Sequence, residues 1–549
     1  MSLQTHSTAP AVNPASGWAG RARAAVARRL AEPNPVWIRE LRQSARLTRT
    51  PVILAVLTSV MTLLIASIGG VLSVTAEPAQ VGIGVFHTFF SLAFAVVTCV
   101  GPAVAAATIA SERSGRTWEA LLLTGLSPAT IAQGKFLAAL SYVSLYVVML
   151  APVGGLAFLF GGVTPTEVLL AFAFLFLIAG LSVAFGLAMS SKFASPALAI
   201  LVTLFVAVPL SFVTYLAGGV GLSFAAHELW PGVTSGAPVW LPTAYVRADF
   251  GLGYFVFLVL CPLVAAGVPG WLFYEVTIAN MAAPSDDRST RLRIWILASA
   301  PLLAALMALS AWALENVEWS IAGQAVCWAF FTFVAFLIAG EPLGPSARIE
   351  ARWQRQQAGR AARWLGPGVG RAALLSFVLA LVSLGGVTAV GALLATSRDD
   401  LYAVLAFGGY ALGFTTFLLG FAATSRARGS SAAVPRVILA GVLFLALLGP
   451  YIAMAIGGIL TDGNERVLLM AAPSPAFAFV VVDKLHSPGG DAELFALAGS
   501  AAAVGWGLIG LGLLAAGALG ADRRWRAGRA ERRATELSRD DAAASAVSP

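Results

Sequence analysis

The amino-acid sequence predicts an all-α protein, a polytopic membrane helix bundle of about twelve transmembrane helices. Of its 549 residues, 58% are apolar and only 11% carry a charge, a composition that soluble globular domains do not have. The apolar residues form runs of about 20 or more, the length that an α-helix needs to cross a bilayer. The charged residues lie between these runs, and their distribution favours one orientation in the membrane.

Twelve apolar runs predict the spans. They cover residues 51–75, 82–110, 136–160, 168–189, 197–222, 250–276, 294–314, 320–340, 372–396, 401–424, 437–460 and 494–520. The third and fourth runs are nearly continuous, and Gly161-Gly162-Val163-Thr164-Pro165 predicts a tight turn between them. Since the number of spans is even, the two termini are expected on the same side of the membrane.

The positive-inside rule predicts that both termini are cytoplasmic. With that orientation, only Arg247, Arg398, Arg466 and Lys484 of the 35 Lys and Arg residues lie outside. The net charge of +8 is therefore explained by topology and by anionic lipid headgroups, and nucleic acid is not expected as a partner. Arg far outnumbers Lys, as in GC-rich bacterial genomes, so the expected location is the bacterial inner membrane. The first 50 residues contain no apolar run typical of a cleavable signal peptide.

Residues 1–50 are expected to form a disordered segment, rich in Ala, Ser and Pro over residues 1–20, followed by an interfacial helix. Asn34-Pro35 supplies an N-cap and a first-turn proline. An apolar face then runs beside a face of arginines, which is typical of a helix that lies in the membrane interface with its arginines toward lipid phosphate. A simple juxtamembrane anchor is the alternative. The residues assigned to the interfacial helix are Trp37, Arg39, Leu41, Arg42 and Arg46.

The loop lengths indicate two six-span halves, residues 51–276 and 277–520, followed by a cytoplasmic tail, residues 521–549. The long inner loops 111–135 and 341–371 are six spans apart, and so are the long outer loops 223–249 and 461–493. Both outer loops contain apolar stretches too short to span, which predict short helices that cap the outer mouth. A faint sequence echo joins Pro242-Thr243-Ala244-Tyr245 and Ser474-Pro475-Ala476-Phe477.

No enzymatic or metal site is predicted. The Asp, Glu, Lys and Arg residues avoid the middles of the predicted spans, which argues against a proton- or sodium-driven carrier. Cys99, Cys261 and Cys327 lie in different spans, so we expect neither a disulfide nor a metal cluster. The dipeptide Gly134-Lys135 is followed by Phe136 and lacks the pattern of a phosphate-binding loop. We therefore predict no catalytic, cofactor-binding or metal-binding residues. The energy source for transport is expected outside the chain.

The inner loop 111–135 is the most informative polar segment. Thr117 to Leu126 predict a short helix with Trp118, Leu121, Leu122 and Gly125 along one side, flanked by Glu112 and Glu119. Exposing that apolar stripe to cytosol is unfavourable, so we expect a protein or lipid surface to cover it.

This loop resembles that of the membrane-spanning subunit, or permease, of ABC-2 type ABC exporters. In that family the loop reads approximately E-x-x-x-G-T-x-E-x-L-L, then a Pro/Ser turn and G-K. The chain has Glu112, Thr117, Glu119, Leu122, Leu123, Ser127-Pro128 and Gly134-Lys135 in that order. It departs where Arg116 precedes Thr117, with Gly115 one place early, and where Gly125 replaces a frequent proline. The resemblance covers residues 34–276, including Asn34-Pro35-Val36 of the interfacial helix.

The resemblance implies a coupling helix that inserts into a separate ATP-binding cassette subunit. The expected partners are that subunit, which would hydrolyse ATP, and the lipid bilayer. The chain itself would be a non-catalytic permease without a cofactor that exports an unidentified substrate. Either one chain forms the pathway, or it pairs with a second copy or a second permease. The residues assigned to ATPase coupling are Glu112, Thr117, Trp118, Glu119 and Leu122.

Two other functions stay open at this point. Glu112-Arg113-Ser114-Gly115-Arg116 is similar to a motif of major facilitator secondary transporters, but Thr108 stands where those proteins have glycine. A non-transporting membrane scaffold would bury the same helices. The second inner loop, with Glu350 and a basic run from Arg348 to Arg371, is interpreted as a membrane-surface helix in preference to a degenerate coupling element.

Overall fold

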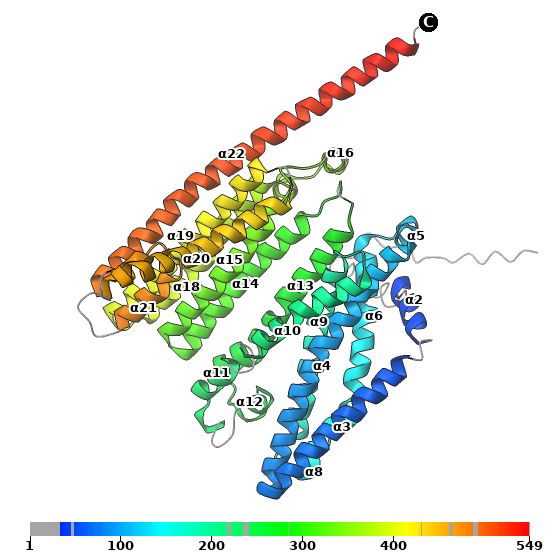
Figure 1. The fold of residues 1–549 in the computed structure, drawn as a ribbon, viewed down its shortest axis with the longest axis vertical. Coiled ribbons are helices and arrows are strands. Elements are labelled where there is room, and N and C mark those ends of the chain that lie inside the picture. Colours follow the sequence, from blue (N-terminus) through cyan, green and yellow to red (C-terminus); the bar gives the residue numbers. More distant parts are fainter. Residues whose placement is uncertain are drawn as a thin grey trace, which may run out of the picture.

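The computed structural model describes residues 33–45, 49–216, 221–233, 241–283, 285–429, 431–460, 465–486 and 492–547. Within these ranges the secondary structure is helical without strands, and twelve helices are long and apolar enough to cross a membrane, which confirms the predicted fold class. Figure 1 shows them running side by side along one diagonal direction.

The first six spanning segments lie between residues 49 and 281. They are α3 (Arg49–Thr75), α4 (Pro78–Ser114), α6 (Pro128–Met149) with the short α7 (Ala151–Gly154) and α8 (Ala157–Phe160), α9 (Pro165–Ser190), α10 (Pro196–Thr214), and the π-helix η3 (Tyr254–Leu260) continued by α13 (Cys261–Met281). The second six are α14 (Thr290–Leu314), α15 (Val317–Ala339), α18 (Val369–Leu394), α19 (Arg398–Arg428), α20 (Ala433–Leu460) and α22 (Ala492–Val547).

Shorter helices lie at both ends of the bundle. At one end are α2 (Pro35–Ala45), α5 (Thr117–Leu123), α16 (Ala347–Arg355) and α17 (Arg360–Leu365), together with the C-terminal part of α22, which extends beyond the other helices (Figure 1). We call this the basic end. At the opposite end are α11 (Gly221–Leu229), η2 (Pro231–Val233), α12 (Leu241–Arg247), η4 (Glu465–Ala471) and α21 (Phe477–His486), in the two loops for which the sequence predicts short helices.

The predicted boundary at residue 276 falls inside α13, which continues to Met281. The predicted spans also underestimate α4, α19 and α22, since each helix continues into charged sequence beyond the apolar run. The predicted turn between the third and fourth spans is present. Gly161 and Gly162 have φ of +83° and +80°, which glycine adopts without steric cost, and Thr164 forms a capping box with Glu167 at the start of α9.

The same helix pairs pack in each set of six spans. In the first set α4 packs against α9, and α9 also packs against α6 and α13; in the second, α15 packs against α19, and α19 also packs against α18 and α22. The short helices of the long loops at the opposite end repeat the pattern, since α12 packs on α9 and α21 packs on α19. Direct packing between the two sets runs mainly through α14, against α13 and η3.

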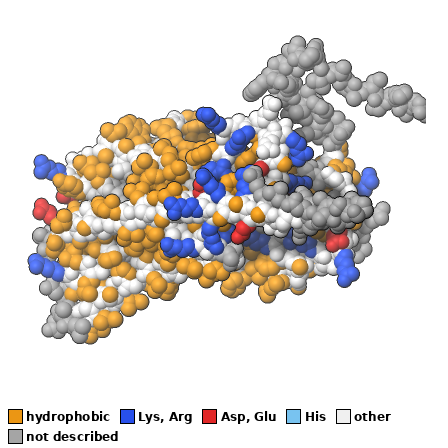
Figure 2. All heavy atoms as spheres, turned by 90° about the horizontal axis from the view of Figure 1, so that it is seen from above, with side chains coloured by type: hydrophobic (Ala, Val, Ile, Leu, Met, Phe, Trp, Pro, Cys, Tyr) orange, Lys and Arg blue, Asp and Glu red, His pale blue; other side chains and the backbone are white. Residues whose placement is uncertain are grey.

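Small residues bring the most closely packed helices together. A Cβ atom added to Gly420 of α19 would lie 2.4 Å from the carbonyl oxygen of Gly510 in α22, and one added to Gly510 would lie 2.4 Å from the backbone nitrogen of Phe417. Such backbone contact is typical of membrane helices, which associate through close packing and hydrogen bonds. The outward sides of α3, α10 and α20 carry exposed apolar side chains, as expected of surfaces that face lipid. In Figure 2 such hydrophobic flanks adjoin a region where Lys and Arg gather.

Candidate docking site at the basic end

The helix α2 is fixed against the start of α6. The Asn34 side-chain oxygen accepts a hydrogen bond from the Val36 backbone nitrogen at 3.0 Å, and its Nδ2 donates to the Thr130 carbonyl at 2.8 Å. Val36 is buried, and a Cβ atom added to Gly134 would lie 2.6 Å from the Val36 Cβ. The glycine of Gly134-Lys135 is therefore required by the close approach of α2.

Four charged side chains join α2, α4 and α6. Lys135 Nζ lies 3.2 Å from Glu40 Oε1 and 3.0 Å from Glu112 Oε1. Arg39 Nη2 lies 3.0 Å from Glu40 Oε1 and 2.5 Å from Glu112 Oε1. The Lys135 side chain is 1% exposed and also donates to the Thr108 carbonyl at 3.4 Å, whereas the Arg39 side chain is 44% exposed. This four-residue network ties the N-terminal helix to both ends of the loop that contains α5.

The charges of the network influence one another. Burial of Glu40 acts to raise its pKa, but the positive charge of Lys135 and hydrogen bonds from Arg39 and Lys135 outweigh it and lower the pKa below 4.5. Glu40 therefore contributes stability that is fully present above the pKa of its unfolded form and is lost as pH falls through its lower folded pKa.

The lowered pKa of Glu40 predicts how the effect of Glu40→Gln on stability depends on pH. The stability difference between the wild-type protein and E40Q should be constant above pH 4.5 and should shrink as pH falls below it, because Glu40 then binds a proton in both states. Denaturant titration of both proteins in the same micelles, repeated across pH, measures this difference. A difference that grows on acidification would contradict the assigned network.

The helix α5 buries part of the apolar stripe that the sequence predicts and exposes Leu123. Leu121 is 5% exposed and Trp118 is half-buried, with the Arg113 guanidinium 5.5 Å from its ring centroid. Both side chains pack on the core of the first set of spans. The protein itself therefore covers Leu121 and part of Trp118, whereas Gly125 is exposed, so an external cover for the rest of the stripe stays a prediction. Leu123, by contrast, is 88% exposed.

The loop departs from the ABC-2 pattern at Arg116 and Gly125, and both residues have a left-handed backbone conformation. Arg116, between α4 and α5, has φ of +58°, a left-handed conformation that favours glycine, and the chain has its glycine one position earlier. Gly125, after α5, has φ of +74°. Both turns around α5 therefore depend on left-handed residues, and the one at Arg116 is strained.

The structure brings together only part of the predicted site. Glu112 and Arg39 meet directly, Thr117 Oγ1 donates to the Glu112 carbonyl at 3.3 Å, and Glu119 is exposed beside Leu123. Within α2, Trp37 donates to Ser141 Oγ at 3.2 Å, Leu41 is half-buried and Arg42 is exposed. Arg39 pairs with carboxylates while its side chain stays 44% exposed, and its predicted contact with lipid phosphate stays a prediction. Arg46 and the Leu122 side chain lie outside the described part of the chain.

Glu40, Lys135 and Leu123 were not among the residues predicted for this site, although Leu123 and Lys135 belong to the ABC-2 loop pattern. The clearest available signal was Lys135, a lysine at the start of an apolar span, since a cation there needs a carboxylate partner. Nothing in the sequence indicated that Leu123 is exposed, because α5 is too short for a 3.6-residue period to define its inward face.

The end of α4 that leads to α5 is attached to α9. Ser190 Oγ accepts hydrogen bonds from the backbone nitrogens of Ile109 and Ala110 at 3.0 and 3.1 Å. A Cβ atom added to Gly186 would lie 2.3 Å from the Pro102 carbonyl oxygen. A displacement of α5 would therefore move α4 and α9 together.

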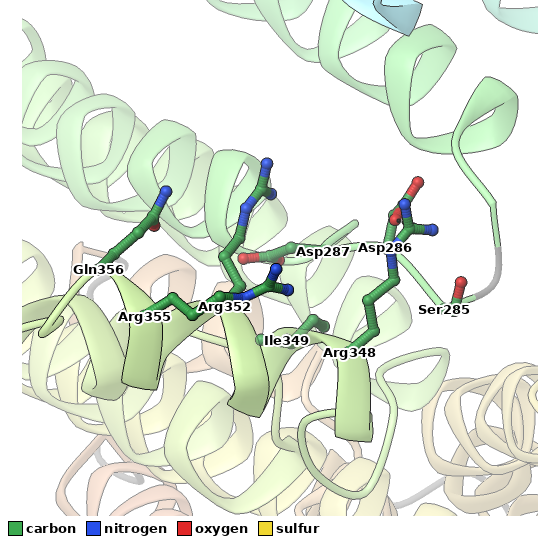
Figure 3. Close-up of a pocket in the computed structure, with 8 residues that line it drawn as sticks. All are labelled: Ser285, Asp286, Asp287, Arg348, Ile349, Arg352, Arg355 and Gln356. Atoms are coloured by element: carbon green, nitrogen blue, oxygen red, sulfur yellow. Dashed lines mark ion pairs between the residues drawn. The ribbon is translucent and has the colours of Figure 1, made fainter.

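The second set of spans has its own buried ion pair at the basic end. Arg293 Nη2 lies 2.6 Å from Glu341 Oε1, and the guanidinium donates to the carbonyls of Trp364, Gly366 and Gly368. The neighbouring α16 presents Arg348, Arg352 and Arg355 toward the loop that carries Asp286 and Asp287, and the Arg348–Asp286 ion pair measures 3.0 Å (Figure 3). One face of α16 therefore meets the connection between the two sets of spans.

Among the described residues, no group of three or more His, Cys, Asp or Glu side chains could hold a metal ion. Comparison with protein-family models, curated proteins and solved structures gives no match for this chain. The residues themselves therefore carry the functional argument.

Proposed function

We propose that this protein is the permease subunit of an ATP-driven exporter of the ABC-2 type. In this proposal the basic end faces the cytoplasm of a bacterial cell, and a separate ATP-binding cassette subunit docks on α5. The observation that carries the proposal is the arrangement around α5: an exposed apolar residue, Leu123, on a short helix whose two flanking segments are held by the network of Arg39, Glu40, Glu112 and Lys135.

The proposed docking surface is small and amphipathic. Leu123 offers the apolar contact, and the exposed Thr117 and Glu119 offer polar contacts on the same helix. Truncated or charged side chains at the centre of such a contact remove most of the binding energy, whereas residues at its rim matter less. Among the described side chains of α5, Leu123 is therefore the one expected to dominate docking.

The connection from α5 to α4 and α9 supports a coupling role. The charge network holds α2 and α6 beside the end of α4, and Ser190 holds α9 to the same end. A push on α5 would therefore act on several spans together, as an ATP-driven movement requires.

The repeated packing supports a single chain that supplies both sides of the pathway. Each set of six spans has the same helix pairs, and the sets touch chiefly through α14. A second copy or a second permease would then not be needed. Residues that face the pathway would select the substrate. The chain would perform no catalysis and would hold no cofactor.

The docking prediction is tested by Leu123→Asp. We expect this variant to lose the co-purifying ATPase and ATP-dependent transport by about tenfold or more, because a charge replaces the central apolar contact. The measurement is the amount of ATPase retained by the affinity-purified protein. Trp364→Asp in α17, also at the basic end and 40% exposed, is the matched control and should retain the ATPase.

The outcomes separate the three functions. Retention of the ATPase by L123D with loss in W364D would move the dock to the second inner loop and contradict the proposal. Transport that continues without any ATPase and stops with a proton uncoupler would support a secondary transporter. Partners that stay bound without any flux would support a scaffold.

A further inference from the structure

A cavity of about 550 Å³ lies at the basic end of the second set of spans. It is bounded by the start of α18 and by the part of α22 that leaves the apolar bundle. Its lining includes four apolar residues, Leu343, Leu374, Ala518 and Ala521, which we call its apolar floor. Three arginines, Arg363, Arg371 and Arg529, also line it, together with Glu350 and Asp522. The cavity thus joins this apolar floor to cationic side chains contributed by α17, α18 and α22.

One wall of the cavity is built by tight packing. The Trp525 indole nitrogen donates to the Pro345 carbonyl at 3.2 Å, and a Cβ atom added to Gly344 would lie 2.5 Å from the Trp525 ring. The Arg529 guanidinium lies 5.3 Å from the ring centroid of Trp525 and pairs with Glu350 at 3.0 Å. The charge of Arg529 is therefore already neutralised by a carboxylate.

Two other arginines that line the cavity, Arg363 and Arg371, can contribute positive charge to an anion-binding site. Arg371 donates to the Pro367 carbonyl at 2.6 Å and to the Arg363 carbonyl, and Arg363 is exposed. Neither guanidinium has a carboxylate within ion-pair distance among the residues that the structure describes. Asp522, which also lines the cavity, pairs with Arg526 at 2.7 Å. An anion could therefore bind between two arginines, whose planar donor groups match the geometry of phosphate.

We propose that this cavity binds an anionic phospholipid from the leaflet at the basic end, with its phosphate between Arg363 and Arg371 and its acyl chains along Leu374. Basic pockets between transmembrane helices are known to bind anionic lipid headgroups. Leu374, which lines the cavity, is 46% exposed, and the indoles of Trp353 and Trp525 also line it. Tryptophan is a residue that favours the membrane interface. A soluble phosphate would leave the apolar floor unfilled. The site does not depend on the proposed ATPase.

Native mass spectrometry of the full-length protein in detergent tests this site. Dioleoyl phosphatidylglycerol is the probe, dioleoyl phosphatidylcholine is the neutral comparison, and inorganic phosphate is the competitor. We expect one phosphatidylglycerol molecule to bind more tightly than phosphatidylcholine and to resist millimolar phosphate. Arg363→Gln should weaken it about tenfold by removing a charge-assisted contact. Leu374→Trp, which leaves the charge unchanged, should weaken it by filling part of the apolar floor.

Arg352→Gln is the matched control, because Arg352 lies on α16 but lines the neighbouring cavity of Figure 3. This variant should change phosphatidylglycerol binding by less than about twofold. Equal losses in R352Q and R363Q would overturn the proposal in favour of diffuse surface charge. Displacement of the lipid by phosphate, or wild-type binding in L374W, would also overturn it. Melting temperatures in phosphatidylcholine micelles verify that the variants are folded.

Discussion

Replacing Lys135 with methionine is expected to destabilise the protein by about 3–5 kcal/mol, because it leaves two partly buried carboxylates without their buried partner. The Lys135 side chain is 1% exposed and lies within 3.2 Å of Glu40 and 3.0 Å of Glu112. Arg39 contacts both carboxylates from a more exposed position and can compensate only in part. The free energy of unfolding in mixed micelles, obtained by titration with a denaturing detergent, measures the loss.

Two further variants make this prediction specific to the network. Lys192 is exposed at the same end of the bundle, and Lys192→Met should cost less than about 0.5 kcal/mol. Adding Glu112→Gln to K135M should recover part of the lost stability, since one stranded carboxylate is removed. A cost for K135M no larger than that of K192M would show that the network does not hold α2, α4 and α6 together.

Replacing Arg293 with methionine is expected to cost a similar amount, about 3–5 kcal/mol. The Arg293 side chain is 3% exposed, pairs with Glu341 at 2.6 Å and donates to the Gly368 carbonyl at 2.8 Å and the Trp364 carbonyl at 3.2 Å. Methionine would strand Glu341 and leave these carbonyls without a donor. The same detergent titration measures the effect, and loosening of the segment 340–368 should follow.

Arg291, two residues away on α14, is the control for Arg293. Its side chain is 51% exposed and pairs with Glu275 at 3.3 Å, so Arg291→Met should cost no more than about 1 kcal/mol. Arg293→Lys should lie between wild type and R293M, because lysine keeps the charge but lacks the planar set of donors. Equal costs for R291M and R293M would contradict the assignment of a buried anchor.

The sequence predicted the fold class and the number of spanning helices because both depend on local composition. Apolar runs of about 20 residues admit few structures other than membrane helices. The turn between the third and fourth spans is encoded within five residues, which include Gly161-Gly162 and Thr164-Pro165. The start of α2 at Asn34-Pro35 was predictable for the same reason. Helix lengths were less predictable, since α4, α19 and α22 continue through charged sequence that no apolar period marks.

The candidate site required the tertiary structure. Lys135 meets Glu40 and Glu112 across 95 and 23 positions of sequence, and nothing local selects these partners from the other carboxylates. The inward orientation of Trp118 and Leu121 likewise depends on where α5 packs, because a seven-residue helix has too few turns to define a face. The burial of Leu121 and of part of Trp118 was therefore not predictable from the stripe alone.

An ATP-binding subunit that docks on α5 should be captured there by site-specific crosslinking in native membranes. A photoreactive maleimide would be attached at Leu123→Cys after replacement of Cys99, Cys261 and Cys327, with Leu159→Cys, 79% exposed in α8, as the comparison. Docking on α5 predicts a product from position 123, absent from position 159, that contains a protein with a phosphate-binding loop and changes in yield with ATP. A product without a nucleotide-binding partner, or equal products from both positions, would contradict it.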